Sequence, residues 1–201
     1  ALTMKTLGDA VHLRNRLIAL LEEADSECCS LERKPLLTMV VAGGGFAGVE
    51  TIAGINDFLR EAVRFYPRLD ESQLRLVLVH SGPVILPELG EELGRYAQKK
   101  LGSRGIEIRT GTRVQGAGDD GVLLSDGSLI QARTIVCTAG TAPSPIISTL
   151  PCGKERGRIA VNEFFELSEY PGVYALGDSA SVPDLETGQA CPPTAQDALR
   201  Q

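Results

Sequence analysis

The sequence predicts an α/β fold in which short buried strands alternate with amphipathic helices. Residues 36–42 and 74–79 form mainly apolar runs, interrupted by Thr38 and Arg75, of the kind found in strands that are buried on both faces. Stretches with apolar side chains at helical spacing precede and follow these runs. Glycine is abundant, at 22 of 201 residues, and tryptophan is absent. This composition favours an α/β fold over an all-β sandwich.

Charge and hydropathy argue against several classes of protein. The chain has 20 basic and 26 acidic side chains, for a net charge of −6, and no basic run. A nucleic-acid-binding protein would carry a basic patch, so we expect no nucleic-acid partner. No apolar run approaches the roughly 20 residues that span a bilayer. The first residues lead directly into an amphipathic helix, so we also expect no secretory leader.

The cysteines and histidines do not have the spacing of a metal site. Five cysteines, at positions 28, 29, 137, 152 and 191, form no CxxC pair. This spacing indicates free thiols in a reducing compartment such as the cytoplasm, rather than a disulfide framework or a structural zinc site. A disulfide between the adjacent Cys28 and Cys29 is the less favoured alternative. The two histidines, His12 and His80, cannot form a metal site by themselves, so we expect no bound metal ion.

The first half of the chain has the pattern of alternating helices and strands. Apolar residues at helical spacing predict one helix over 7–30, and Lys34-Pro35 is expected to break the chain after it. A strand over 36–42 leads through a glycine-rich turn into a helix over 47–65. A strand over 74–79, a helix over 89–101 and a strand over 106–109 follow.

The second half differs in character. Short apolar segments between 114 and 130 are separated by Asp119-Asp120-Gly121 and Asp126-Gly127, which are hairpin-turn sequences. They predict a β-meander after the βαβαβ unit. A strand over 134–138, a proline-rich irregular stretch over 143–171 and a strand over 173–176 follow, and a helix begins at Thr194. Because the chain stops soon after that helix begins, we expect it to be a fragment.

The glycine-rich turn carries the functional signal. Gly43-x-Gly45-x-x-Gly48 lies between a predicted strand and a predicted helix, with Gly44, Phe46 and Ala47 at the intervening positions. In a Rossmann-like fold, the first glycine of this pattern permits a tight turn, the second lets a pyrophosphate approach the backbone, and the third lets the helix pack on the strand. The helix start then offers N–H groups and a partial positive charge to the phosphates. The alternative is a glycine-rich turn that binds nothing.

Two further residues are candidates for this site. Dinucleotide-binding folds place an acidic residue at the end of the second strand, where it binds the adenosine ribose, but here that strand ends in His80. A neutral histidine can bond a ribose hydroxyl and a protonated one can tolerate a 2′-phosphate, so both NADH and NADPH stay open, as does an ordinary polar role for His80. Glu50 lies in the predicted first helical turn, where either the helix dipole or a role beside the nicotinamide accounts for it.

Three segments together resemble flavin-dependent pyridine nucleotide oxidoreductases. Residues 40–50 (VVAGGGFAGVE) resemble the second nucleotide motif of this family, and residues 173–180 (VYALGDSA) resemble its late flavin motif. Residues 191–198 (CPPTAQDA) are similar to the segment that type II NADH:quinone dehydrogenases place beside the flavin ring and the quinone. The resemblance covers nearly the whole chain.

The resemblance implies a Rossmann-like NAD(P)H-binding domain over 1–142, including its lead-in helix, and a partial FAD-domain segment over 143–201. Gly177 and Asp178 would then bind FAD, with Asp178 accepting hydrogen bonds from its hydroxyl groups. Ala139 and Gly140, at the end of strand 134–138, would also contact a cofactor. Ala195 and Gln196 would lie beside the flavin ring and the quinone pocket, and Glu50 beside the nicotinamide. Glu50 and Gln196 are the implied catalytic residues.

The implied activity is hydride transfer from NAD(P)H to FAD, followed by electron transfer to a quinone. The parent enzyme would be peripheral on the cytoplasmic face of the inner membrane and a possible homodimer. A sulfide:quinone or ferredoxin-type reductase and a non-catalytic nucleotide-binding module are the alternatives. Sulfide chemistry would need paired reactive cysteines, and the candidates, Cys137 and Cys191, are expected to be buried. The chain departs from the family pattern at His80 and Arg200 and lacks the first flavin-binding half, so we expect it to retain no FAD by itself.

Overall fold

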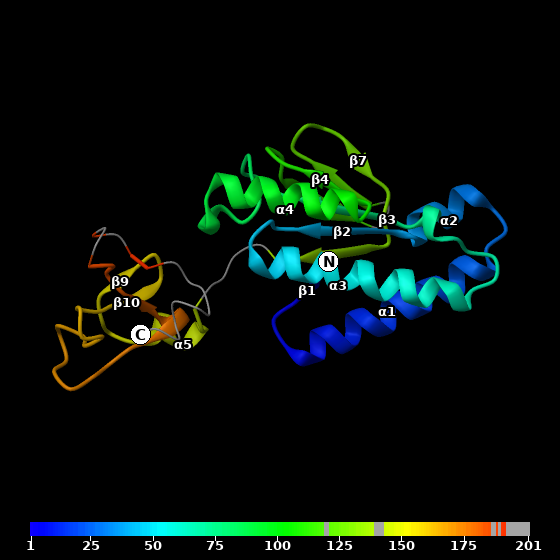
Figure 1. Cartoon of the computed structure of the whole chain (residues 1–201). Coiled ribbons are helices and arrows are strands. Elements are labelled where there is room, and N and C mark those ends of the chain that lie inside the picture. The colour runs from blue at the N-terminus through cyan, green and yellow to red at the C-terminus, as the bar shows by residue number, and fades with distance from the viewer. Residues whose placement is uncertain (119–120, 139–142, 186–187, 189, 192–201) are drawn as a thin grey trace. The chain divides into compact units, whose positions relative to one another are not determined.

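A computed structural model describes residues 1–118, 121–138, 143–185, 188 and 190–191. The chain forms two compact units, Ala1–Ala139 and Gly140–Gln201, and each is described by itself (Figure 1). The expected helix start at Thr194 and four predicted site residues, Ala139, Gly140, Ala195 and Gln196, lie outside the described residues.

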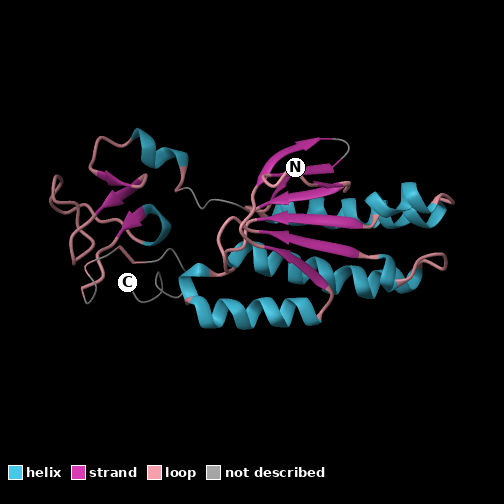
Figure 2. Cartoon of the chain, turned by 90° about the horizontal axis from the view of Figure 1, so that it is seen from above, coloured by secondary structure: helices cyan, strands magenta, loops and turns pink. Residues whose placement is uncertain are grey.

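The first unit is built on a five-stranded parallel sheet with the strand order β1-β8-β2-β3-β4. Its strands are β1 (Leu2–Thr3), β2 (Thr38–Ala42), β3 (Arg75–Val79), β4 (Ile106–Arg109) and β8 (Thr134–Cys137), which lie side by side in Figure 2. Because every pairing is parallel, the carboxyl ends of all five strands lie along one edge of the sheet. Ligands bind at this edge in open α/β sheets.

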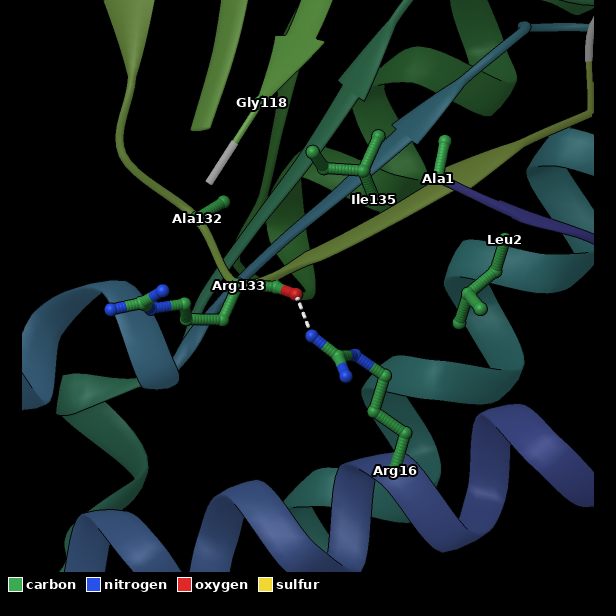
Figure 3. A pocket seen from close by; sticks show the side chains of 7 residues that line it. All are labelled: Ala1, Leu2, Arg16, Gly118, Ala132, Arg133 and Ile135. Atoms are coloured by element: carbon green, nitrogen blue, oxygen red, sulfur yellow. Dashed lines mark hydrogen bonds between the residues drawn. The ribbon is translucent and has the colours of Figure 1, made fainter. Parts of the chain in front are cut away.

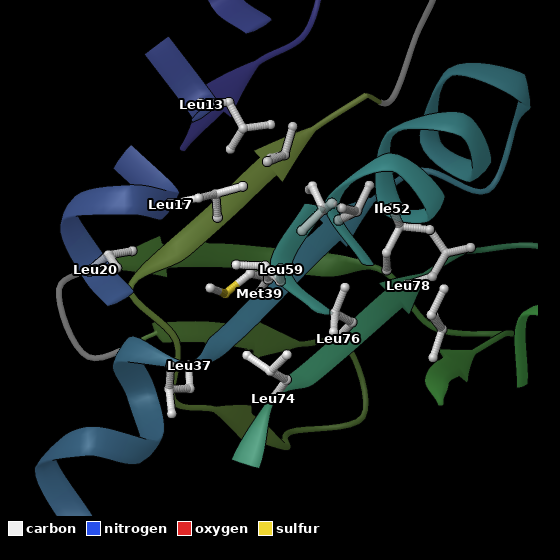
Figure 4. Close-up of a cluster of buried hydrophobic side chains, with 14 of the residues drawn as sticks. Leu13, Leu17, Leu20, Leu37, Met39, Ile52, Leu59, Leu74, Leu76 and Leu78 are labelled. Atoms are coloured by element: carbon white, nitrogen blue, oxygen red, sulfur yellow. The ribbon is translucent and has the colours of Figure 1, made fainter. Parts of the chain in front are cut away.

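Helices cover one face of this sheet. They are α1 (Leu7–Ser26), α2 (Ser30–Leu36), α3 (Phe46–Ala62) and α4 (Glu91–Ser103). Side chains alternate along a strand, so Met39 and Val41 face the helices while Val40 faces the other way. Figure 4 shows Met39 in the cluster with Leu17 of α1 and Leu59 of α3. Burial of apolar side chains on both faces explains the mainly apolar runs in the sequence.

An antiparallel meander covers the other face of the sheet. Its strands are β5 (Val114–Gly118), β6 (Gly121–Leu124) and β7 (Leu129–Ile130), paired in the order β5-β6-β7. Val122 and Leu124 of β6 are completely buried and pack with Val40 and Val77 of the parallel sheet. The first unit therefore has three layers: helices, a parallel sheet and a meander. This arrangement confirms the predicted Rossmann-like α/β architecture.

The helix predicted over 7–30 starts at its predicted residue but is four residues shorter, and the break predicted at Lys34-Pro35 is wrong. The first helix ends at Ser26, and α2 begins at Ser30 with Pro35 inside its last turn. A proline removes one N–H hydrogen bond and its ring crowds the carbonyl four residues earlier, but Pro35 lies one residue from the end of α2, so no longer helix is interrupted. The guanidinium of Arg33 donates hydrogen bonds to the carbonyls of Glu27 and Arg68, which fixes the short helix in place.

The other elements of the first unit follow the prediction closely. Strand β4 occupies the predicted residues 106–109, and α3 starts one residue before its predicted start and ends at Ala62, where the 3₁₀ turn η1 (Val63–Phe65) continues it. Two further 3₁₀ turns are η2 (Glu71–Gln73) and η3 (Pro87–Leu89). Strand β1 was not predicted. It has only two residues, which pair with Val136 and Cys137 of β8.

The second unit has a small core. Its elements are α5 (Pro145–Thr149), β9 (Lys154–Glu155), β10 (Arg158–Ala160), the 3₁₀ turn η4 (Gly177–Ser179) and β11 (Ala180–Ser181). Strand β10 pairs with β9 antiparallel and with β11 parallel. Ile147, Ile159 and Leu167 form the buried cluster. The expectation that 143–171 is irregular is therefore wrong for α5, β9 and β10.

The predicted strand over 173–176 does not form. Its one bridge among the described residues joins Tyr174 to Glu166, and the side chains of Val173, Tyr174 and Leu176 are 48%, 61% and 54% exposed. A strand needs a partner strand for its backbone and cover for its apolar side chains. Within the second unit, this segment has only a short antiparallel contact with residues 165–167.

No helix in the described part of the chain is long and apolar enough to cross a membrane. Among the same residues, no group of three or more histidine, cysteine, aspartate or glutamate side chains is arranged to hold a metal ion. Cys137 is exposed and Cys191 is partly buried, so the expectation that both are buried is wrong for Cys137, which lies at the carboxyl end of β8.

Candidate functional site

The glycine turn connects β2 to α3 at the carboxyl edge of the parallel sheet. Gly43 has a φ of +122°, in a region that side-chain-bearing residues rarely adopt. Its N–H donates to the carbonyl of Val79 at 2.9 Å, which holds the start of the turn against the end of β3. The tight turn predicted for the first glycine of the motif is therefore present.

Gly48 brings α3 into direct contact with the turn. A Cβ atom at this position would lie 1.7 Å from the carbonyl oxygen of Gly43 and 2.8 Å from Oγ1 of Thr138. Thr138 follows β8, and its hydroxyl donates to the carbonyl of Ala42 at 3.1 Å. This close packing of helix on strand is the role that the sequence predicts for Gly48. Thr138 was not predicted, because its partner is 96 residues away in the sequence.

Gly45 leaves space at the start of α3. It is the N-cap residue, it makes no side-chain capping hydrogen bond, and a Cβ built on it would have no neighbour within 4 Å. The N–H groups of the first helical turn, which includes Phe46 and Ala47, have no intrahelical acceptor. An anion can therefore approach these N–H groups without a side chain in the way, and the helix dipole favours it.

His80 packs against the glycine turn from the end of β3. Its Nδ1 atom accepts a hydrogen bond from the N–H of Gly44 at 3.2 Å. A Cβ on Gly44 would lie 2.6 Å from Cγ of His80, and a Cβ on Gly82 would lie 2.8 Å from Nε2. The imidazole ring is thus fitted between two glycines. The carbonyl of Gly44 also accepts from the N–H of Leu86 at 2.7 Å, so both backbone groups of Gly44 are hydrogen-bonded.

Glu50 does not lie in the first turn of α3. The helix begins at Phe46, so Glu50 is its fifth residue and is beyond the strongest influence of the helix dipole. The expectation of a first-turn position is therefore wrong, because Glu50 lies at the start of the second turn. Its exposed side chain lines an apolar groove of about 390 Å³ between α1 and α3. Leu13, Leu17, Ile55 and Phe58 form part of the groove wall.

A second cavity, of about 260 Å³, lies away from the glycine turn. It is lined by residues including Leu2, Arg16, Ala132 and Arg133, at the amino end of β8 (Figure 3). The Arg16 guanidinium donates to the carbonyl of Arg133 there. Because the glycine turn follows the carboxyl end of β2 in a parallel sheet, this cavity is at the opposite edge from the candidate nucleotide site.

A cluster of charges surrounds Glu107 of β4. Its carboxylate accepts from Nε of Arg109 at 2.6 Å and from Nη2 of Arg75 at 2.9 Å. Partial burial by itself would raise the pKa of Glu107, but the hydrogen bonds and positive charges of Arg109 and Arg75 outweigh it, and the pKa is lowered. These ion pairs hold β3 to β4. The backbone carbonyl of Arg109 also accepts a hydrogen bond from the backbone N–H of His80 at 2.8 Å.

In the second unit, Gly177 and Asp178 open the short 3₁₀ turn η4. Gly177 has a φ of +61° and Asp178 is exposed. The chain therefore presents this carboxylate at its surface. Among the described residues, the predicted site residues lie in three places: the glycine turn with His80, the groove between α1 and α3 that Glu50 lines, and the Gly177-Asp178 turn of the second unit.

The sequence matches the pyridine nucleotide-disulphide oxidoreductase family over residues 4–201. This chain belongs to that family. The match extends over both units, and the glycine turn, which opens on the sheet edge used for ligands in α/β folds, is part of it.

Curated proteins with similar sequences include the type II NADH:quinone oxidoreductase Ndh of Mycobacterium tuberculosis, which is 29% identical over 98% of this chain and 43% of its own length. The internal alternative NAD(P)H-ubiquinone oxidoreductase A1 of Solanum tuberosum mitochondria is 30% identical, over 98% of this chain and 40% of its own. The chain thus spans less than half the length of these relatives.

Solved structures share the fold. The structure of NDH2 from Plasmodium falciparum in complex with NADH covers 90% of this chain with a TM-score of 0.79 at 20% identity. A ferredoxin reductase from Rhodopseudomonas palustris covers 94% with a TM-score of 0.65 at 24% identity. At these identities, the likeness establishes the fold and leaves the electron acceptor open.

Proposed function

We propose that this chain binds NAD(P)H at the glycine turn, as the coenzyme-binding part of a flavin-dependent NADH:quinone oxidoreductase. The observation that carries the proposal is the open N-terminus of α3. Gly43 makes the tight turn, Gly48 lets the helix pack against it, and Gly45 leaves space where a diphosphate would meet the N–H groups of the first turn. The residues present therefore fit a dinucleotide. The named relatives, which are NADH and NAD(P)H oxidoreductases, support the same coenzyme.

The individual roles follow from these positions. Gly43, Gly44 and Gly45 supply the backbone of the turn, and Phe46, Ala47 and Gly48 supply the first turn of the helix. His80 lies where the ribose of the adenosine would be bound. Glu50 is one helical turn beyond Phe46 on an exposed surface, where its carboxylate would influence charge or hold a proton near the nicotinamide.

We assign the second unit to a flavin domain. Gly177 and Asp178 would bind FAD. From outside the described residues, Ala195 and Gln196 are proposed to border the flavin ring and the quinone pocket, and Ala139 and Gly140 to contact a cofactor. When bound, FAD would supply the acceptor for the hydride and deliver electrons to a quinone. The exposed carboxylate of Asp178 can accept hydrogen bonds from flavin hydroxyl groups. A peripheral location on the cytoplasmic face of a membrane and a homodimer are parts of the same proposal.

Titration of the chain with NADH tests the coenzyme site. The chain has no tryptophan, so the fluorescence of the coenzyme reports binding with little interference. Gly45 has a φ of −77°, which alanine also adopts, so Gly45→Ala should preserve the fold and place a methyl group in the path of the diphosphate. We expect the affinity for NADH to fall about tenfold, equivalent to ~1.4 kcal/mol.

Gly54→Ala is the matched control, because Gly54 lies in the same helix with nothing within 4 Å of a built Cβ. Its affinity for NADH should equal that of the unaltered chain. Absence of NADH binding to the unaltered chain would contradict the proposal. The acceptor is tested separately, in a chain that also carries the remaining flavin domain, by comparing NADH oxidation with a soluble quinone, a ferredoxin and sulfide.

A further inference from the structure

The residue at the end of β3 is a histidine, where dinucleotide sites usually have an acidic residue that accepts hydrogen bonds. The side chain there is an imidazole, and its Nδ1 atom accepts from the N–H of Gly44 at 3.2 Å. A nitrogen that accepts a hydrogen bond carries no hydrogen itself, so in the neutral ring the hydrogen is on Nε2. His80 therefore brings one N–H donor, on the Nε2 atom beside Gly82, and no negative charge to the end of β3.

The orientation of the ring is fixed by its surroundings. The backbone of His80 donates to the carbonyl of Arg109 at 2.8 Å and accepts from the N–H of Thr112 at 3.2 Å. Gly44 and Gly82 both lie close to the ring. A Cβ on Gly44 would be 2.6 Å from Cγ of His80, and a Cβ on Gly82 would be 2.8 Å from Nε2. The ring cannot turn to offer an acceptor without losing the Gly44 hydrogen bond.

A carboxylate at this place accepts hydrogen bonds from ribose hydroxyl groups and repels a 2′-phosphate. A ring that offers only an N–H donor does neither, because it can donate to a hydroxyl oxygen or to a phosphate oxygen alike. We propose that His80 is a specificity-determining residue that allows this chain to bind NADPH about as tightly as NADH. This inference rests on the proposed coenzyme site at the glycine turn.

The test compares NADH and NADPH in the same fluorescence titration of the 201-residue chain. We expect the two dissociation constants to agree within about threefold, because no charge at position 80 distinguishes the coenzymes. In His80→Glu, one carboxylate oxygen can accept from Gly44 while the other faces the ribose. NADPH should then bind about tenfold or more weakly than NADH, because like charges repel.

Two further variants make the result specific. His80→Gln keeps an acceptor for Gly44 and a donor for the ligand, so it should bind both coenzymes about equally. His12→Gln changes the other histidine, which is exposed on α1, and should leave both affinities unchanged. A preference of the unaltered chain for either coenzyme greater than about threefold, or a ratio of the two dissociation constants that His80→Glu does not change, would overturn this inference and leave the proposed coenzyme site intact. Failure of both coenzymes to bind would instead overturn the proposed function.

Discussion

The contact between Gly48 and the turn leaves no room for a side chain. In Gly48→Ala, the new methyl group would meet the carbonyl of Gly43, which is backbone and cannot move aside freely. We expect the free energy of unfolding to fall by about 3 kcal/mol, near the upper end of the usual cost of overpacking. Urea denaturation followed by circular dichroism measures this change.

Gly54→Ala provides the comparison for that experiment. Gly54 lies in the interior of α3 and has open space around it, so alanine should stabilise the helix by about 0.5–1 kcal/mol. Equal effects of the two substitutions would contradict the packing role of Gly48.

The lowered pKa of Glu107 makes one part of the stability depend on pH. A carboxyl group whose pKa is lower in the folded state stabilises the protein above its unfolded pKa, near 4.5, and this contribution is lost as pH falls through the folded pKa. Glu107→Gln should therefore reduce the free energy of unfolding at neutral pH, by about 1 kcal/mol or less because the pair is partly exposed. The difference from the unaltered chain should shrink below pH 4.5. Urea denaturation at neutral and acid pH checks it, and a constant difference would be inconsistent with this role.

Some residues of the site could be recognised from the sequence and others could not. The spacing of Gly43, Gly45 and Gly48 follows a local rule, so their conformations were predicted. The contribution of Thr138 depends on β8 lying beside β2, a pairing between distant parts of the chain. The fit of His80 between two glycines also needs the folded loop after β3, which no local pattern reports.

At the scale of elements, α1 begins with a reciprocal capping box. The hydroxyl of Thr6 accepts from the N–H of Asp9 at 3.1 Å, and the carboxylate of Asp9 accepts from the N–H groups of Lys5 and Thr6. These backbone hydrogen bonds lower the pKa of Asp9. Thr6→Ala removes the hydroxyl and should reduce the free energy of unfolding by about 1 kcal/mol. Thr6→Ser, which keeps it, should stay within measurement error of the unaltered chain in thermal and urea denaturation.

The elements that were predicted are long or strongly patterned. Strands β2 and β3 and helix α3 are each marked by apolar side chains whose spacing fits a single structure. Strands β1, β9 and β11 have two residues each, which is too short for any periodicity. The segment 173–176 has the apolar composition of a strand but lacks cover in the second unit, and composition alone does not reveal whether a partner is present.

At the scale of the whole molecule, the two units differ in the size of their cores. The first has two large buried clusters on the two faces of its sheet, whereas the second has a cluster of Ile147, Ile159 and Leu167. Local opening costs less where few apolar contacts are broken. Hydrogen exchange monitored by mass spectrometry should therefore show the amides of β10 exchanging at least about tenfold faster than those of β2. Equal protection of the two strands would show that the second unit is stabilised by more than this cluster.

The fit of His80 between two glycines also has an evolutionary consequence. A Cβ at position 44 would lie 2.8 Å from the Cβ of His80, so position 44 needs glycine whichever side chain stands at 80, whereas a Cβ at position 82 would meet only the far end of the ring, at Nε2. Related sequences should therefore keep glycine at 44 and show correlated substitutions at 80 and 82, with an imidazole at 80 accompanied by glycine at 82. A lineage that changes its coenzyme preference through position 80 would have to keep or regain both glycines, which limits the order in which such mutations can accumulate.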